Sequence, residues 1–234
     1  MQEIREEYLG YNIVIQKPDK AACKKPWVWR AEFLGAFDYA DKALLEQGWH
    51  VATFEIHDMY GCDESVELMK KFHDYVVDKY GLNPKPSIFG ISRGGLYGVN
   101  YAVKYPEDLS SLYLDAPVLD IRAWPRGSKQ TIKEWEECKK CYGLDEKSAD
   151  TFNKNPIDKA DALIKSGIPV ILVAGGSDEV VSFEKNSARL IEKYKENGIE
   201  LPHVIKPECG HHPHSLEEPK VIVDFVKNAF NKKK

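Results

Sequence analysis

The sequence lacks several features that would place it in a whole class of protein. No apolar run among its 234 residues approaches the length of a membrane span. The acidic, polar start at residues 1–7 lacks the basic and apolar stretches of a signal peptide. Five cysteines, an odd number scattered along the chain, do not indicate a disulfide framework. We therefore expect a cytoplasmic protein without a membrane partner.

An excess of positive charge is absent as well. The chain has 33 Lys and Arg residues against 37 Asp and Glu residues, for a net charge of −4. This balance argues against a surface that binds nucleic acid or an anionic membrane. The length suits one α/β domain with a full core, and we find no internal repeat. The oligomeric state stays open.

Apolar runs typical of buried strands alternate with segments of helical spacing along most of the chain. This alternation favours a mostly parallel central sheet flanked by helices, which is the α/β class. Strands are predicted at 11–15, 27–33, 49–56, 86–89, 109–118, 168–174 and 201–206. Helices are predicted at 40–47, 64–80, 95–105, 132–141, 160–164, 182–197 and 219–231.

Residues 90–94, Gly-Ile-Ser-Arg-Gly, match the pattern G-x-S-x-G. A predicted strand runs into this motif and a predicted helix leaves it. That context is what a nucleophile elbow requires, because the serine then sits exposed on a strained turn between small residues. We interpret Ser92 as a catalytic nucleophile, and the alternative is an ordinary glycine-rich turn.

An acid and a histidine follow the ends of two later predicted strands. Asp178 comes just after the strand at 168–174, and His211 comes shortly after the strand at 201–206. The order of serine, acid and histidine resembles the α/β-hydrolase superfamily, and the resemblance runs from about residue 14 to about residue 230. Its matching motifs are Gly-Ile-Ser-Arg-Gly at 90–94, Gly-Gly-Ser-Asp-Glu-Val-Val at 175–181 and Gly-His-His-Pro-His-Ser at 210–215.

The resemblance implies a catalytic triad of Ser92, Asp178 and His211. Glu179 and Asp120 are rival acids, and the position of Asp178 before Val180 and Val181 favours it. The resemblance also implies an α/β-hydrolase fold with residues 1–234 as a single domain. In this superfamily a cap often covers the active site, and we interpret residues 121–155 as a small helical cap insertion.

An oxyanion hole would complete such a site. The resemblance implies one donor, the backbone N–H of Arg93. Many members carry His-Gly where this chain has residues 29–35, so the second donor departs from the common pattern. We expect it to be the backbone N–H of Glu32 or Phe33. We interpret Arg30 and Glu32 as an ordinary ion pair at the strand end, and a role in substrate binding is the alternative.

Other polar clusters are interpreted as structural. Adjacent histidines rarely converge on one ion, so we expect no metal at His211, His212 and His214. The pair Cys138 and Cys141 lacks the second pair that a zinc site would need. The triad chemistry requires no cofactor, and we expect none.

Three further side chains are candidates for substrate contact, with plain packing as the alternative. Asp58 and Tyr60 follow a strand at the carboxyl edge of the sheet, where ligands gather in open α/β folds. Trp124 lies in the predicted cap, and aromatic residues with a few polar groups suit a ring-shaped or sugar-bearing substrate.

The leading interpretation is a serine esterase that cleaves a small soluble carboxylic ester through an acyl-enzyme. The acyl group would be short or aryl, and the ester could be carried by a carbohydrate. A peptidase or thioesterase with the same triad is the alternative, and an inactive binding protein on a hydrolase fold is a third. A cofactor-free peroxidase or lyase on this fold also stays open.

Overall fold

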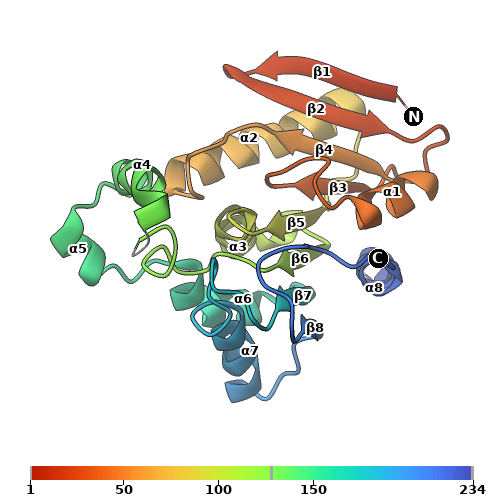
Figure 1. The fold of residues 1–234 in the computed structure, drawn as a ribbon. Helices are drawn as coiled ribbons and strands as arrows, with labels where there is room; N and C mark the ends of the chain where they lie inside the picture. Colours follow the sequence, from red (N-terminus) through yellow and green to blue (C-terminus); the bar gives the residue numbers. More distant parts are fainter. Residues whose placement is uncertain (1, 127–128, 233–234) are drawn as a thin grey trace.

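One eight-stranded sheet runs through the molecule in the computed structural model, which describes residues 2–126 and 129–232 (Figure 1). The strand order is β1-β2-β4-β3-β5-β6-β7-β8, with antiparallel pairing of β1 with β2 and β2 with β4 and parallel pairing elsewhere. The strands are β1 (Gln2–Tyr8), β2 (Tyr11–Lys17), β3 (Trp27–Arg30), β4 (His50–Phe54), β5 (Ser87–Ile91), β6 (Ser111–Asp115), β7 (Val170–Gly175) and β8 (His203–Lys206).

Helices cover both faces of this sheet. Figure 1 shows α1 and α8 on one face and α2, α3, α6 and α7 on the other. The helices are α1 (Tyr39–Glu46), α2 (Asp63–Tyr80), α3 (Gly94–Lys104), α4 (Ile132–Tyr142), α5 (Glu146–Asp150), α6 (Ala160–Ser166), α7 (Ser187–Glu196) and α8 (Lys220–Lys232). Three short 3-10 turns join them in the described chain: η1 (Pro106–Asp108), η2 (Lys129–Thr131) and η3 (Pro156–Lys159). The predicted α/β class with a mostly parallel sheet is confirmed.

The buried core falls into two clusters, one on each side of the sheet. The larger one joins α2 and α3 to the sheet through residues such as Phe72 and Leu96. The smaller one joins α1 and α8 through Leu44 and Val226. Burial of these apolar faces on both sides explains why the central strands read as continuous apolar runs.

Two strand predictions need correction. The strand β1 was not predicted, because its seven residues are mostly charged and exposed. An edge strand tolerates such residues, since one side of it faces solvent. The predicted strand at 27–33 ends earlier, at Arg30, and the chain then turns sharply at Phe33, whose φ is 56°.

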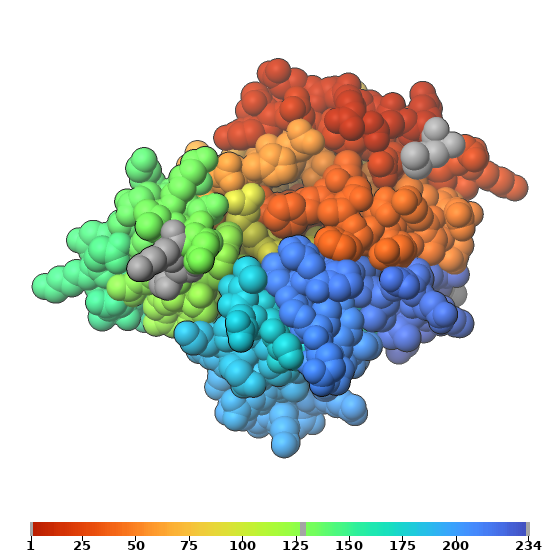
Figure 2. Space-filling view, viewed as in Figure 1, coloured from red at the N-terminus to blue at the C-terminus, as the bar shows by residue number. Residues whose placement is uncertain are grey.

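The segment 121–155 does contain two helices, α4 and α5, although its residues 127 and 128 lie outside the described part of the chain. Figures 1 and 2 show this segment, in green, at one edge of the molecule. Trp135 and Cys138 of α4 belong to the larger core cluster. The segment is therefore anchored in the main core, and its role as a cap stays a prediction.

None of the helices described in residues 2–126 and 129–232 combines the length and apolarity needed to cross a membrane.

Candidate active site

Ser92 occupies a tight turn between β5 and α3. Its φ is 49°, a left-handed conformation that is uncommon outside glycine. The turn is possible because its neighbours are small: a Cβ on Gly90 would lie 2.9 Å from the Gly94 carbonyl oxygen, and one on Gly95 would lie 2.5 Å from the Pro117 Cβ. The strained turn is the geometry that the sequence motif predicts.

Three side chains from distant parts of the chain form a hydrogen-bonded series at this turn. Ser92 Oγ lies 2.9 Å from His211 Nε2, and His211 Nδ1 lies 2.7 Å from Asp178 Oδ2. The second carboxylate oxygen of Asp178 accepts the backbone N–H groups of Val180 and Val181 at 3.0 and 2.9 Å. The carboxylate is thus fixed on its own loop and presents one oxygen to the histidine.

The two rival acids lie elsewhere. Glu179 is exposed. Asp120 accepts two hydrogen bonds from the Arg122 guanidinium, at 2.9 and 2.8 Å, and one from Arg189 at 3.0 Å. Burial alone would raise the pKa of Asp120, but these partners outweigh it and lower the pKa. Asp178 is therefore the acid that the structure brings to His211.

Backbone N–H groups gather beside the serine from two segments. Arg93 caps the N-terminus of α3, where the helix dipole is positive. A Cβ on the next residue, Gly94, would lie 3.7 Å from the Glu32 nitrogen, so the loop after β3 reaches the elbow. Among the described backbone hydrogen bonds, none uses the N–H of Arg93, Glu32 or Phe33. These are the donors predicted for an oxyanion hole.

A buried ion pair ties these two segments together. Arg93 Nε and Nη2 donate to the two carboxylate oxygens of Glu32 at 2.7 and 2.9 Å. Burial alone would lower the pKa of Arg93, but the charge and hydrogen bonds of Glu32 raise it, so the guanidinium stays charged. Planar two-point contacts of this kind fix orientation as well as distance. The pair therefore sets the spacing of the elbow and the loop after β3.

The ion pair predicted between Arg30 and Glu32 is wrong. Arg30 lies on the other side of the loop, where its Nη1 is 3.1 Å from Asp41 Oδ2 of α1. Its Nη2 donates to the carbonyl oxygens of Phe33 and Ala36 at 2.7 and 2.8 Å. In a continuous strand, residues two apart would point to the same face, but the chain leaves the strand after Arg30, so the two side chains separate.

The three candidate substrate residues lie around Arg93. Asp58 accepts from Arg93 Nη1 at 2.8 Å and is 57% exposed. Tyr60 is fully buried, and its ring centroid lies 5.2 Å from the guanidinium carbon of Arg93. The Tyr60 hydroxyl donates a hydrogen bond to Glu137 Oε2 at 3.0 Å. Trp124 is partly buried against Tyr60, at 6.3 Å between ring centroids. Substrate contact by these three residues stays a prediction. The complete burial of Tyr60 argues against direct contact between Tyr60 and a substrate.

A pocket of about 280 Å³ opens beside Ser92. Apolar and aromatic side chains of the loop after β3 form one side of it, and histidines form the other. Its lining residues are Phe33, Ala36, Phe37, Ile91, Ser92, His211, His212 and His214. Ala36 and Phe37 were not predicted from the sequence, and their place just after a central strand was the available signal.

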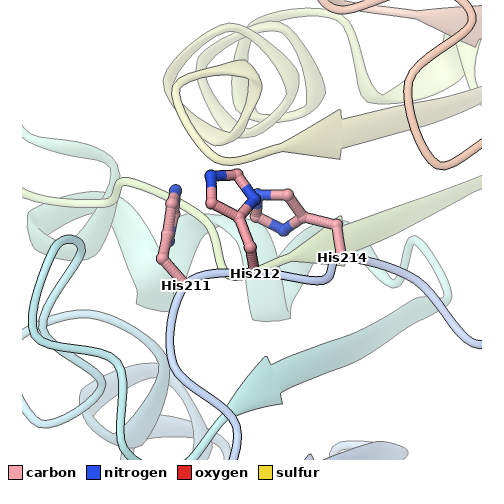
Figure 3. A group of neighbouring side chains, drawn as sticks. All are labelled: His211, His212 and His214. Atoms are coloured by element: carbon pink, nitrogen blue, oxygen red, sulfur yellow. The ribbon is translucent and has the colours of Figure 1, made fainter.

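The three neighbouring histidines lie close together in the fold, while the expectation of no metal at them stays a prediction. Ligand atoms of His211, His212 and His214 all lie within 4.8 Å of one another, and Figure 3 shows the three rings side by side. His214 is buried, with its Nδ1 2.7 Å from Asp115 Oδ1 at the end of β6. Asp115 was not predicted, and its position at the carboxyl end of a central strand was the available signal.

The cysteines take no part in the triad. All five are free thiols. Cys138 is buried in the core, while Cys141 Sγ donates to the Asp58 carbonyl oxygen at 3.4 Å. The interpretation of these two residues as structural is consistent with these contacts.

Comparison with known proteins gives this arrangement a family. The sequence profile of the prolyl oligopeptidase family matches residues 54–233, well over half of the chain. The chain belongs to the prolyl oligopeptidase family. It is therefore a serine hydrolase of the α/β-hydrolase superfamily, which confirms the resemblance seen in the sequence.

A solved structure agrees with the family at the level of the fold. The crystal structure of Porphyromonas gingivalis dipeptidyl peptidase 4 superposes with a TM-score of 0.67 at 15% identity. The match covers 98% of this chain and 35% of that one, so the chain spans about a third of the length of that peptidase. No curated protein matches the sequence significantly. Likeness at this identity shows a shared fold, and the bond that this family member cleaves has to be argued from its own site.

Proposed function

We propose that this protein hydrolyses a small, neutral carboxylic ester through an acyl-enzyme on Ser92. An alcohol is a weak nucleophile at neutral pH, so Ser92 needs a base within hydrogen-bond reach. His211 Nε2, at 2.9 Å, would take the proton as Ser92 Oγ attacks the carbonyl carbon. The same proton would then pass to the departing alcohol, and water would release the acid by the reverse route.

Asp178 would act on His211 rather than on the substrate. Its 2.7 Å contact with Nδ1 selects the tautomer that leaves Nε2 free to accept a proton. It would also stabilise the imidazolium that forms during attack. The negative oxygen of the tetrahedral intermediate would be held by the backbone N–H of Arg93 and one from Glu32 or Phe33.

The pocket beside Ser92 is the observation that supports an ester. Its volume of about 280 Å³ falls just below the roughly 300–1,000 Å³ typical of sites for drug-sized ligands, so it suits a compact group. No Lys, Arg, Asp or Glu is among its described lining residues. Near the serine, Arg93 pairs with the carboxylates of both Glu32 and Asp58, so each of these described charges already has a partner of opposite sign. A neutral substrate of short acyl or aryl type fits these surroundings.

The second candidate is a peptidase, and the family match favours it. The family carries the name of a peptidase, and the solved relative is a dipeptidyl peptidase by its title. An exopeptidase must hold a charged chain end, yet the described charged groups beside the pocket are already paired. A peptide bond within a chain would need no such group, so cleavage of an internal amide is the form that this candidate takes.

Matched substrates test the two candidates. One short acyl group would be presented as an ester, a thioester and an amide, with an acetylated sugar in the same panel. We expect the largest kcat/KM for the ester, at least about a hundredfold above the amide. Amide turnover comparable to that of the ester would make the peptidase the better assignment.

A further inference from the structure

The histidines that follow β8 form a cluster that catalysis does not fully use. The ring centroids of His211, His212 and His214 lie 4.6–4.9 Å apart, and each ring offers a nitrogen within 4.8 Å of the others (Figure 3). The triad needs only one of these rings. The other two are therefore available for a different role at the same place.

Two of the three histidines are held as metal-ligating histidines usually are. His211 Nδ1 contacts Asp178 at 2.7 Å, and His214 Nδ1 contacts Asp115 at 2.7 Å. A carboxylate behind Nδ1 fixes the ring and directs Nε2 toward the ion in known zinc sites. Asp115 is itself held by Tyr113 Oη and by the Ser215 N–H. The rings of His211 and His214 are therefore both held in place, which leaves the Nε2 atom of each ring to bind a metal ion.

The third histidine is free to move. His212 is exposed, and no hydrogen bond to its ring nitrogens occurs in the described residues. Its ring lies on that of Phe37, with centroids 5.7 Å apart and planes 17° apart.

The distances between the three histidine nitrogens are longer than a bound zinc ion requires, but they can shorten. Zinc–nitrogen distances of about 2.0–2.1 Å place tetrahedral ligands about 3.3 Å apart. The nitrogens here span up to 4.8 Å, so at least one ring must move inward by about 1 Å. His212 can make this movement, since an exposed ring on an aromatic face has no polar contact to lose.

We propose that His211, His212 and His214 form a binding site for a transition-metal ion such as Zn²⁺, and that the ion inhibits hydrolysis. His211 Nε2 cannot bind the ion and accept the Ser92 proton together, because both uses need the same lone pair. Occupancy would therefore disconnect Ser92, whose Oγ lies 2.9 Å from that nitrogen. The inhibitory part rests on the proposed function, whereas the binding part does not.

The test begins with metal binding, measured on protein first treated with EDTA. Zn²⁺ is titrated by calorimetry, and Co²⁺ absorption reports tetrahedral coordination. Variants are His212→Ala, which removes an exposed ligand, and Ser92→Ala, which removes the competitor for His211. His203→Ala is the matched control, an exposed histidine at the start of β8.

We expect one Zn²⁺ per chain, binding at least about tenfold weaker in His212→Ala, and unchanged binding in His203→Ala. Ser92→Ala should bind as tightly as the wild type or more tightly. Equal binding by wild type and His212→Ala, or none by the wild type, would overturn the site.

Ester hydrolysis is then followed against Zn²⁺ concentration, with each variant compared with its own metal-free rate. The midpoint of inhibition should equal the Kd of the wild type and shift by the same factor in His212→Ala. Binding with undiminished hydrolysis would overturn the inhibition alone. A wild type that cleaves no acyl substrate would count against the proposed function, and the calorimetry would still decide the site.

Discussion

At the scale of single residues, backbone strain gathers around the nucleophile. Ser92, Phe33, Asp58 and Tyr60 all have φ between 49° and 61°. Non-glycine residues in this region cost free energy and persist where the surroundings hold them in place. Here the holding group is Arg93, which contacts the other segments through its side chain. The strained backbone places the half-buried Ser92 at its tight turn, next to the loop after β3.

The sequence predicts the three side chains that the fold brings together at Ser92, but not the residues that support them. The motif around Ser92 is local, and the acid and histidine follow strands whose ends must meet at one edge of a parallel sheet. Asp115 and His214 are 99 residues apart, and Arg93 and Glu32 are 61 apart. Many carboxylates could have served either partner, so only the folded chain selects these.

Asp178 carries a prediction at this scale. Asp178→Asn should lower kcat on an activated ester by about 10³- to 10⁴-fold, because the amide favours the wrong tautomer of His211. Unfolding by urea should change far less than activity. Glu179→Gln, the exposed neighbour, is the control and should keep nearly full activity. A large loss in that control with a mild one in Asp178→Asn would assign the acid to Glu179.

At the scale of elements, the long strands and helices were predictable and their ends were not. The helix α2 shows both: its apolar face is periodic, and Gly81 ends it with φ of 63°, as expected from the sequence. The missed strand β1 has too little apolar pattern to be read without its partner β2. Pairing with β2 supplies the order that its own residues do not specify.

The loop after β3 carries the second prediction. Glu32→Gln removes the charge that holds Arg93, and the loop should lose its fixed distance from the elbow. We expect kcat to fall about 10- to 100-fold with a smaller change in KM, because misplaced donors act mainly on the transition state.

Asp58→Asn serves as the comparison, since Asp58 contacts the same arginine from an exposed position. Exposed ion pairs contribute about 0–1 kcal/mol, so kcat should fall less than about fivefold. Equal losses in the two variants would contradict the special role of Glu32.

The start of α3 carries the third prediction. A Cβ on Gly95 would lie 2.5 Å from Pro117, which packs against the helix. Gly95→Ala should therefore lower the free energy of unfolding by about 1–3 kcal/mol. Gly94→Ala, whose Cβ would meet its neighbours at an ordinary 3.7 Å, is the matched control for chemical denaturation. Similar stability of the two variants would mean that the helix can shift away from Pro117.

At the scale of the whole molecule, the sheet acts as the frame that brings distant segments together. Figure 2 shows segments coloured orange, cyan and blue meeting near the middle of one face. They are the loops after β3, β7 and β8, all at the carboxyl ends of parallel strands. Topology alone therefore explains why a site forms there, whereas the small pocket depends on the particular loop residues.

The response of the whole fold to acid gives the fourth prediction. Asp120, in the loop after β6, pairs with Arg122 of the same loop and with Arg189 of α7. Its pKa is lowered in the folded chain, below the roughly 3.9 of an unfolded aspartate. The stabilisation is therefore present above about pH 4 and is lost as pH falls through the folded pKa.

Asp120→Asn should lower the free energy of unfolding by about 1–3 kcal/mol at pH 7, and the difference from the wild type should shrink below about pH 4. Urea denaturation at pH 7 and pH 3 measures both values. The exposed Glu184→Gln variant should show little effect at either pH. A pH-independent difference for Asp120→Asn would mean that packing, rather than charge, explains the loss.

The central claim is that Ser92 is an activated nucleophile held by His211 and Asp178. Intact-mass analysis after treatment with a fluorophosphonate probe tests it most directly, on the wild type and on Ser92→Ala. We expect one adduct on the wild type and none on a folded Ser92→Ala variant. An adduct on that variant, or none on folded wild type, would contradict the claim.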